Sequence, residues 1–259
     1  MTDADARPAE PPRFRLVIGE QDAAGPVAGF VGGRRQPRGG RPWVMINVVA
    51  SVDGATAMAG ESKGLSGPAD REVFHALRGI ADAIMVGAGT VRSDDYGPMR
   101  PRPGVKAARA ARGQAPVAPI VVISRSLTLD WHSALFIEAE VPTVVAAPTD
   151  APELARAAAR AAAPLIVAGT GHVALDEVLA ELARGGHDSV LCEGGPGLFA
   201  QLAEADLLDE VCIAISPLLV AGGAQRVLPG ALLVPPRRLM IAAVLEADGF
   251  LFVRYEVQG

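Results

Sequence analysis

The chain has 259 residues, half of them hydrophobic and a fifth charged, with a formal net charge of −5. This composition suits a globular protein with a sizeable core, and the negative charge gives no electrostatic reason to expect nucleic acid as a partner. No apolar run reaches the ~18 residues of a membrane helix, and the acidic, Pro-rich N-terminus lacks a signal-peptide core. Cys192 and Cys212 lack the spacing of a zinc site, and so few cysteines are typical of a reducing compartment. We therefore expect a cytoplasmic protein with no membrane segment and no metal.

The first part of the chain predicts little regular structure. Residues 1–41 are rich in Gly, Pro and Arg, and we expect a flexible lead-in there, with the pattern of one short strand over Phe14–Ile18. The regular part starts with the continuous apolar run Val44–Ala50, which is typical of a buried strand. Pro68–Arg78 has the apolar spacing of a helix face, and Gly79 is a suitable residue to end that helix.

Strands and helices then alternate. Short apolar runs between turn residues predict strands at Ala83–Val86, Ile120–Ile123, Thr143–Ala146, Leu165–Val167, Ser189–Leu191 and Glu210–Ile215. Leu175–Leu182 has helical spacing, whereas the segment 97–116 has the composition of a loop. Leu239–Leu245 and Phe250–Val257 flank a turn and predict an antiparallel hairpin. This order predicts an α/β fold, a three-layer α/β/α sandwich with a mostly parallel central sheet, formed by a single domain over residues 42–259.

The most informative motif is Cys192-Glu193-Gly194-Gly195-Pro196-Gly197-Leu198, which lies between an apolar run and a helical pattern. A strand that passes through a glycine turn into a helix gathers unpaired backbone N–H groups at the positive end of the helix dipole, and these bind phosphate. Pro196 suits the first helical turn, where its missing N–H is not needed. Glu193 lies at the carboxyl end of the strand, where open α/β sheets bind ligands. The motif predicts a ligand site, although such turns also serve as simple connections.

A second glycine turn competes for the same role. Gly169-Thr170-Gly171-His172-Val173-Ala174 fits the dinucleotide pattern G-x-G-x-x-A, and Glu193 follows near the distance at which that pattern expects an acid. However, Leu175-Asp176-Glu177 indicates that the helix begins after the glycines rather than at them. A plain connection is therefore the favoured interpretation of this turn.

Three motifs taken together resemble one family. Asn47-Val48-Val49-Ala50-Ser51-Val52-Asp53-Gly54, Gly87-Ala88-Gly89-Thr90-Val91-Arg92-Ser93-Asp94-Asp95 and Glu193-Gly194-Gly195-Pro196 occur in the order and spacing of the riboflavin-pathway pyrimidine reductases. These form the reductase half of a bifunctional deaminase-reductase, and the resemblance covers residues 42–257. It implies a dihydrofolate-reductase-like fold and NADPH-dependent reduction of a ribosylaminopyrimidine 5′-phosphate, in its uracil or 2,5-diamino form, to the ribitylamino product.

The resemblance also implies which residues bind the substrate. The matching positions are Asn47, Ser62, Arg78, Arg100 and Glu193. The guanidinium of Arg78 suits the 5′-phosphate, although an arginine at a helix end also complements the helix dipole. The loop Tyr96–Arg102 departs from the family's Asp-Pro-x-Leu pattern, so the match of Arg100 depends on the register of this loop.

A second set of positions resembles contacts to NADPH. These are Ala50, Gly64, Thr90, Asp94, Ser124, Gly194, Gly195, Pro196, Gly197 and Leu198. Arg125 follows Ser124 and adds a positive charge that favours a 2′-phosphate, and hence NADPH. Thr90 and Asp94 also have a purely structural interpretation, because both residue types cap helices.

Two departures separate the chain from the bifunctional enzymes. Asn47 stands where many of them carry a lysine, and Gly64 replaces a common tryptophan. The zinc-deaminase signature H-x-E…P-C-x-x-C does not occur in the chain, so any deamination belongs to a separate protein. These departures leave open which pyrimidine is reduced.

In the implied reaction, hydride passes from the nicotinamide to the sugar carbon C1′, and the enzyme orients both ligands. The proton donor is either Glu193 or a water held near Asp94, so both are candidate catalytic groups. Two other functions fit the same pattern: an NADPH reductase of another heterocycle, such as a pterin, and an NADPH-binding protein without catalysis. NADPH oxidation with the aminated and the deaminated pyrimidine, offered separately, distinguishes the three.

The last segment bears on assembly. Phe250, Phe252 and Val253 in the C-terminal hairpin predict an exposed sheet edge that a partner covers. Members of the family are typically homodimers, so we expect a homodimer that acts on a small molecule.

Overall fold

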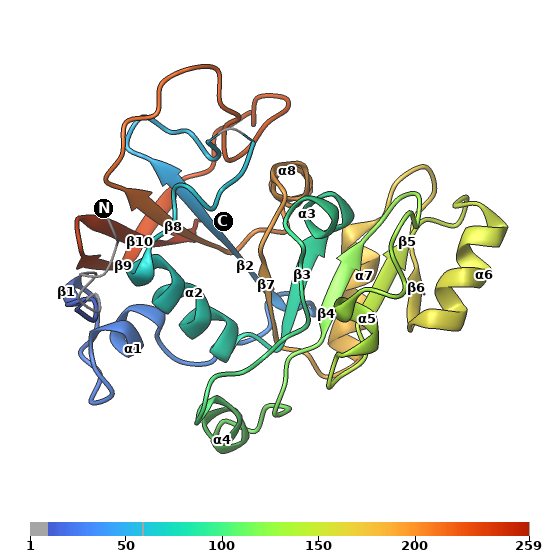
Figure 1. Ribbon diagram of the computed structural model, residues 1–259, viewed down its shortest axis with the longest axis horizontal. Coiled ribbons are helices and arrows are strands. Elements are labelled where there is room, and N and C mark those ends of the chain that lie inside the picture. The colour runs from blue at the N-terminus through green and yellow to red at the C-terminus, as the bar shows by residue number, and fades with distance from the viewer. Residues whose placement is uncertain (1–9, 59, 259) are drawn as a thin grey trace, which may run out of the picture.

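The computed structural model describes residues 10–58 and 60–258, which form one ten-stranded sheet with helices on both faces (Figure 1). The strands are β1 (Arg15–Ile18), β2 (Trp43–Ser51), β3 (Ala83–Gly87), β4 (Ile120–Ile123), β5 (Val144–Ala147), β6 (Leu165–Val167), β7 (Ser189–Cys192), β8 (Glu210–Ser216), β9 (Leu239–Ala247) and β10 (Phe250–Val257). The helices are α1 (Pro26–Val31), α2 (Pro68–Ile80), α3 (Ala88–Ser93), α4 (Val105–Ala111), α5 (Ala134–Ile137), α6 (Glu153–Ala162), α7 (Leu175–Arg184) and α8 (Pro196–Glu204).

The sheet has a parallel part and an antiparallel part. Its order is β1-β9-β10-β8-β2-β7-β3-β4-β5-β6, and the strands from β8 to β6 run parallel. β10, β9 and β1 join antiparallel at one side. The β9–β10 hairpin turns at Asp248-Gly249, where both φ angles are positive, as the tightest hairpin turns require. The predicted α/β fold, with a mostly parallel sheet and a C-terminal antiparallel hairpin, is confirmed.

Alternating side chains along the strands build two cores, one on each face of the sheet. Met45 and Leu191 pack on the face covered by α1, α2, α5 and α6. Their chain neighbours Val44 and Val190 pack on the opposite face, against α7 and α8. Because parallel strands between two helical layers are buried on both faces, they appear in the sequence as continuous apolar runs. The three layers leave the carboxyl ends of β2, β3, β4 and β7 at one edge, where turns lead into α3 and α8.

The N-terminal segment is packed on this sheet. The flexible lead-in expected over residues 1–41 falls partly outside the described residues, but β1 pairs with β9 and the side chains of Phe30 and Val31 in α1 are buried. Arg35 donates to the fully buried carboxylate of Glu210 at 2.7 Å. An unpaired buried carboxylate is costly, so this contact ties the segment to β8. The expected boundary at residue 42 therefore lies inside the packed unit.

Two local predictions are wrong for a shared reason. α2 continues through Gly79 to Ile80, and the segment 97–116, predicted as loop, contains α4. The fully buried Arg109 donates to the carbonyls of Gly79 and Ala81, and Arg112 donates to Gly79 at 2.7 Å. These side chains donate hydrogen bonds to the last carbonyl groups of α2. A turn with glycine at the helix end often fills this role. α5 and the alanine-rich α6 also had no prediction, because neither has a long apolar stripe.

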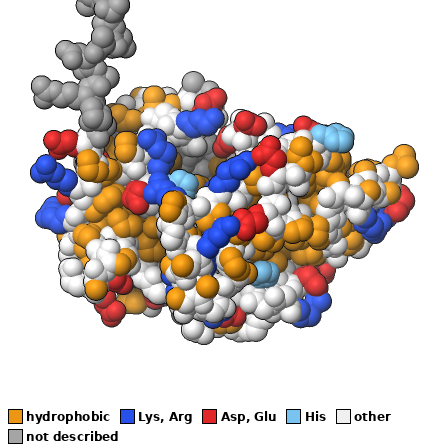
Figure 2. Space-filling model, turned by 60° about the horizontal axis from the view of Figure 1, so that its bottom comes forward, with side chains coloured by type: hydrophobic (Ala, Val, Ile, Leu, Met, Phe, Trp, Pro, Cys, Tyr) orange, Lys and Arg blue, Asp and Glu red, His pale blue; other side chains and the backbone are white. Residues whose placement is uncertain are grey.

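The predicted exposed edge in the C-terminal hairpin is also wrong. Phe250, Phe252 and Val253 are at most 8% exposed, because β10 lies between β9 and β8 rather than at the edge. On the outer surface, basic and acidic side chains are interspersed (Figure 2). The basic segment after residue 100 takes part in this pattern through ion pairs of Arg102 with Glu72 and of Lys106 with Glu140.

Candidate active site

The glycine turn after β7 is fixed by backbone contacts to β3. The Glu193 N–H donates to the Met85 carbonyl at 2.9 Å, and the Gly87 N–H donates to the Gly194 carbonyl at 2.6 Å. Gly194 has a φ of 109°, which only glycine adopts readily. A Cβ atom on Gly195 would lie 3.0 Å from the Thr90 hydroxyl oxygen. Because Gly194 and Gly195 have no side chains, the starts of α3 and α8 lie close together.

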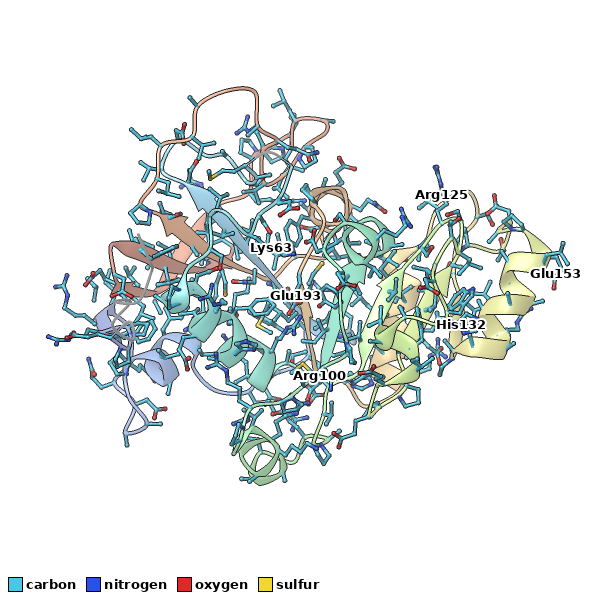
Figure 3. The ribbon with its side chains drawn as sticks, in the orientation of Figure 1. Lys63, Arg100, Arg125, His132, Glu153 and Glu193 are labelled. Carbon is cyan, nitrogen blue, oxygen red and sulfur yellow. The ribbon has the colours of Figure 1, made fainter. Side chains whose placement is uncertain are left out.

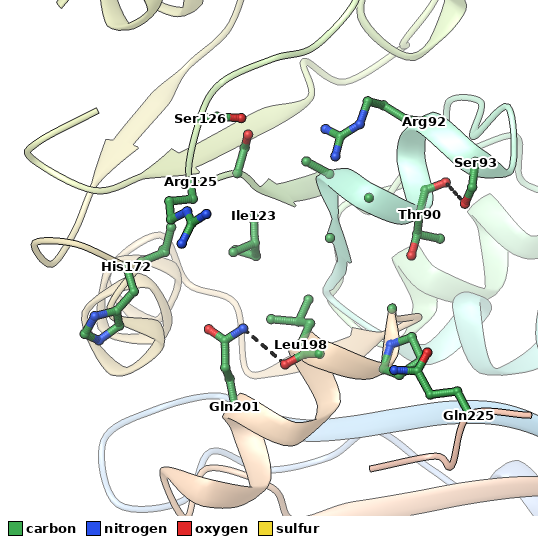
Figure 4. A pocket seen from close by; sticks show the side chains of 18 residues that line it. Thr90, Arg92, Ser93, Ile123, Arg125, Ser126, His172, Leu198, Gln201 and Gln225 are labelled. Carbon is green, nitrogen blue, oxygen red and sulfur yellow. Dashed lines mark hydrogen bonds between the residues drawn. The ribbon is translucent and has the colours of Figure 1, made fainter. Parts of the chain in front are cut away.

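A cavity of about 680 Å³ opens beside this turn, and we call it cavity 1. It is lined by Gly195–Leu198 at the start of α8, by the start of α3, and by Ser124 and Arg125 after β4 (Figure 4). Arg92, Arg125 and His172 surround it, and its lining contains no carboxylate. Within the described chain, the N–H groups of Gly195 and Gly197 have no hydrogen-bond acceptor. Free N–H groups at a helix start, together with arginines, form a site for an anion.

The competing turn at Gly169 is built differently. The Gly169 N–H donates to the Glu177 carboxylate at 3.1 Å, and the Gly171 N–H donates to Asp150 at 2.8 Å. α7 begins only at Leu175. The N–H groups of this turn are therefore used within the protein, and the turn reaches cavity 1 only through the side chains at its tip.

A second cavity, cavity 2, has a volume of about 770 Å³ and lies between β2, α2 and the same glycine turn. The two cavities share part of their lining, since Thr90, Gly195 and Pro196 belong to both. Ligands bound in the two cavities would therefore meet at the carboxyl ends of β3 and β7.

The centre of cavity 2 holds a buried charged cluster of Glu193, Arg78 and Tyr96. The Arg78 Nε and Nη2 atoms donate to the two oxygens of Glu193, each at 2.7 Å, and Nη2 also donates to the Tyr96 hydroxyl at 2.8 Å. The Tyr96 hydroxyl donates to Glu193. The Glu193 side chain is only 4% exposed. It lies near the middle of the molecule (Figure 3).

The cluster fixes the protonation of two of its members. Burial and the adjacent Glu193 charge raise the pKa of Tyr96 well above its usual value, so the phenol keeps its proton and donates it in a hydrogen bond. Burial alone lowers the pKa of Arg78, but the paired carboxylate outweighs burial and raises it. The guanidinium uses Nε and Nη2 within the cluster, and its Nη1 atom has no hydrogen-bond partner among the described residues.

A second buried acid lies at the α2 end of cavity 2. Asp70 is 8% exposed and accepts a hydrogen bond from the Ser66 hydroxyl at 2.6 Å. Burial raises the pKa of Asp70, and the Ser66 contact opposes this shift. Lys63 and Arg71 also line the cavity but form no ion pair with Asp70 among the described residues.

The structure brings most of the predicted site residues together. The following predicted residues line cavity 1, cavity 2 or both: Asn47, Ser62, Arg78, Thr90, Asp94, Ser124, Glu193, Gly194, Gly195, Pro196, Gly197 and Leu198. Thr90 lies at the junction, and Asp94, at the end of α3, accepts from the Ser93 hydroxyl at 2.8 Å.

Three predicted contacts lie outside the lining of both cavities. Ala50 is 3% exposed within β2, where it pairs with Ile215 of β8. Gly64 is exposed and packs against the side chain of Met58. The side chain of Arg100 is 68% exposed and forms an ion pair with Glu138, away from Glu193 (Figure 3). The loop that departs from the family pattern thus carries Arg100 to the surface.

Several lining residues of cavity 2 had no prediction. The residues missed include Lys63, Ser66, Asp70, Arg71, Phe74, Tyr96 and Gln225. One signal was present, since Asp70, Phe74 and Arg78 recur every fourth residue and therefore share one face of α2. Tyr96 had no such signal, because it stands in the loop that departs from the family pattern.

The described residues also bear on metal binding, thiol chemistry and membrane insertion. None of their His, Cys, Asp and Glu side chains form a group of three that could hold a metal. Cys192 and Cys212 are free and buried, and burial raises the pKa of the Cys192 thiol to about 12. No helix in the described ranges has the length and apolar character to cross a membrane.

Two adjoining cavities at the carboxyl ends of parallel strands, one cationic and one polar, are typical of α/β proteins that bring two ligands together. Residues 42–246 match the family model of the RibD C-terminal domain, and the chain belongs to this family.

Similar proteins agree with this assignment. A protein of Methanothermobacter thermautotrophicus named 2,5-diamino-6-ribosylamino-4(3H)-pyrimidinone 5′-phosphate reductase is 38% identical over 188 residues, which are 73% of this chain and 83% of that protein. The riboflavin biosynthesis protein RibD of Mycobacterium tuberculosis is 31% identical over 80% of this chain and 50% of its own length. The crystal structure of a pyrimidine reductase-like protein from Corynebacterium diphtheriae has the same fold, with a TM-score of 0.75 and 24% identity over 84% of this chain and 92% of that one.

Proposed function

We propose that this protein is a reductase of riboflavin biosynthesis that uses NADPH to convert a ribosylaminopyrimidine 5′-phosphate to the ribitylamino compound. The observation that carries the proposal is the junction of cavity 1 and cavity 2 at the glycine turn of Gly194 and Gly195. Family membership and relatives named as pyrimidinone phosphate reductases support it.

The residues of cavity 1 fit a nicotinamide dinucleotide. Gly195 has no side chain, and a Cβ atom there would meet Thr90. The backbone at the start of α8 is therefore open to a pyrophosphate. Ser124 and Arg125, after β4, are placed for the adenosine half, and the positive charge of Arg125 favours the 2′-phosphate of NADPH. When bound, the cofactor supplies the hydride that reduces the sugar carbon C1′.

In cavity 2, the chain's own residues bind and orient the substrate. Arg78 Nη1 and Ser62 are available for the 5′-phosphate, and Asn47 projects from β2 toward the substrate space. Glu193 receives two hydrogen bonds from Arg78 and one from Tyr96. We assign it the role of an acceptor that aligns the sugar, since three donors hold the carboxylate in one orientation. The proton then comes from water that enters beside Asp94.

The decisive experiment offers NADPH with the diamino and the deaminated pyrimidine phosphate in separate assays and follows nicotinamide oxidation. Turnover of at least one substrate supports the proposal. NADPH binding without turnover of either would contradict it and favour a non-catalytic binding protein. Turnover of a pterin instead would indicate a reductase of another heterocycle.

Assembly and location complete the proposal. Leu239, Met240 and Ile241 at the start of β9, which β1 leaves unpaired, are about half exposed. Leu232 and Val234 in the preceding loop are 87% exposed. Exposed apolar groups of this kind mark an interface, and we propose a homodimer, to be checked by light scattering. Free buried thiols suit a cytoplasmic protein.

A further inference from the structure

Asp70 is a buried carboxylate in cavity 2 to which the proposed reaction gives no role. It is 8% exposed, and its only hydrogen-bond partner among the described residues is the Ser66 hydroxyl on Oδ2. Its Oδ1 atom has no partner there, yet it is not enclosed by protein, because the residue lines the cavity. Asp70 therefore places a buried acid with one unused acceptor oxygen at the wall of the space where the substrate binds.

A role in helix stability does not account for this placement. Asp70 is the third residue of α2, where an acid complements the helix dipole. An exposed acid meets that need equally well, whereas burial of a carboxylate with one hydrogen bond is unfavourable. Asp70 accepts no backbone N–H of α2 and forms no ion pair with any described arginine or lysine.

The position of Asp70 along α2 suits one end of the substrate. Asp70, Phe74 and Arg78 lie on the same face of the helix and line cavity 2. Arg78 lies eight positions after Asp70 along the helix, which is a rise of about 12 Å. With the phosphate at Arg78, an extended pentose phosphate that carries one six-membered ring places that ring near Asp70.

We propose that Asp70 is a specificity-determining residue whose Oδ1 atom accepts a hydrogen bond from the 2-amino group of the pyrimidinone. The inference rests on the proposed function and selects between its two substrates. The diamino form presents an N–H donor at the 2-position, which the Oδ1 atom accepts while Oδ2 keeps its bond from the Ser66 hydroxyl. The deaminated form presents a carbonyl oxygen at the 2-position instead, so that two acceptors face each other and the buried acid loses a partner.

The test compares kcat/KM for the two pyrimidine phosphates, first in the unaltered protein and then in Asp70→Asn. The unaltered protein is expected to prefer the diamino form by at least about 100-fold, since sites built around a substrate N–H reject analogues that lack it. Asp70→Asn replaces one acceptor oxygen by a donor, which suits the 2-carbonyl. The preference is expected to fall at least about tenfold, with the loss concentrated on the diamino substrate.

Glu72→Gln is the matched control, because Glu72 lies two residues along α2 and pairs with Arg102 at the surface. It is expected to leave both kcat/KM values unchanged, and melting curves verify that each variant folds. Turnover of both substrates at similar rates by the unaltered protein would overturn the inference without any variant. An unchanged preference in folded Asp70→Asn would also overturn it, while the proposed function would stand. Turnover of neither substrate is the separate failure of the proposed function.

Discussion

Cavity 1 and cavity 2 meet at one glycine turn but handle charge in opposite ways. Cavity 1 has arginines, a histidine and free backbone N–H groups, and no carboxylate in its lining. Cavity 2 holds the buried acids Glu193 and Asp70, each with a hydrogen-bond partner from the protein. A ligand that is held by its phosphates needs only fixed donors. A substrate that must be aligned for hydride transfer needs acceptors and donors in defined positions, and the two cavities divide these tasks.

The largest expected effect comes from Glu193→Gln, which tests whether cavity 2 acts independently of cavity 1. The amide places a donor against Arg78 or Tyr96, so the aligned acceptor is lost. We expect kcat/KM for the pyrimidine to fall about 100-fold to 1,000-fold. Steady-state kinetics measure this loss, and titration of NADPH measures cofactor affinity, which is expected to stay the same. A parallel loss of NADPH affinity would show that the two cavities are not separable.

Arg125→Ala tests cavity 1 with a smaller effect. Arg125 is exposed at the rim, and its charge is available for a 2′-phosphate. We expect the KM for NADPH to rise about tenfold, which corresponds to about 1.4 kcal/mol, and the KM for NADH to stay unchanged. The difference between the two cofactors is expected to shrink at high salt, because an exposed charge is screened. An equal rise for both cofactors would place the 2′-phosphate elsewhere.

Asp53→Asn tests a carboxylate that holds the loop next to both cavities. Asp53 follows β2 and accepts the N–H groups of Val220 and Ala221, in the loop that leads to Gln225 at the cavity junction. The Ser51 hydroxyl and these N–H groups lower its pKa from 3.8 to about 2.

Because the folded-state pKa lies below the unfolded value, Asp53 stabilises the fold above about pH 4 and loses this contribution as the pH falls toward 2. The melting temperature of Asp53→Asn is therefore expected to lie slightly below that of the unaltered protein at neutral pH. The two values are expected to converge at low pH. A difference that does not depend on pH would contradict this role of the carboxylate.

The smallest expected effect is that of Arg100→Ala, which tests the outer limit of cavity 2. Arg100 matches a substrate-binding position by resemblance, but its exposed side chain pairs with Glu138. An exposed ion pair contributes about 0–1 kcal/mol, so kinetics and stability are both expected to change little. A large rise in KM for the pyrimidine would show that the loop brings Arg100 into the cavity when substrate binds.

Local rules made much of cavity 1 predictable. The glycine turn, Pro196 and the start of α8 follow from backbone geometry over a few residues, so neighbouring letters of the sequence identify them. The start of α7 at Leu175, which separates the competing glycine turn from its helix, was predictable in the same way. The end of α2 was not predictable, because Arg109 of α4 and Arg112 just after it donate to the carbonyls at that end.

The sequence by itself determined the alternation of strands and helices, the glycine turn and the family to which they belong. Tertiary structure alone decided the charged cluster, since Glu193, Arg78 and Tyr96 come from the end of β7, from α2 and from the loop after α3. It also decided that Asp70 lines cavity 2 while Arg100 does not. Backbone turns depend on neighbouring residues, whereas a buried charge cluster depends on how distant elements pack, which no local pattern specifies.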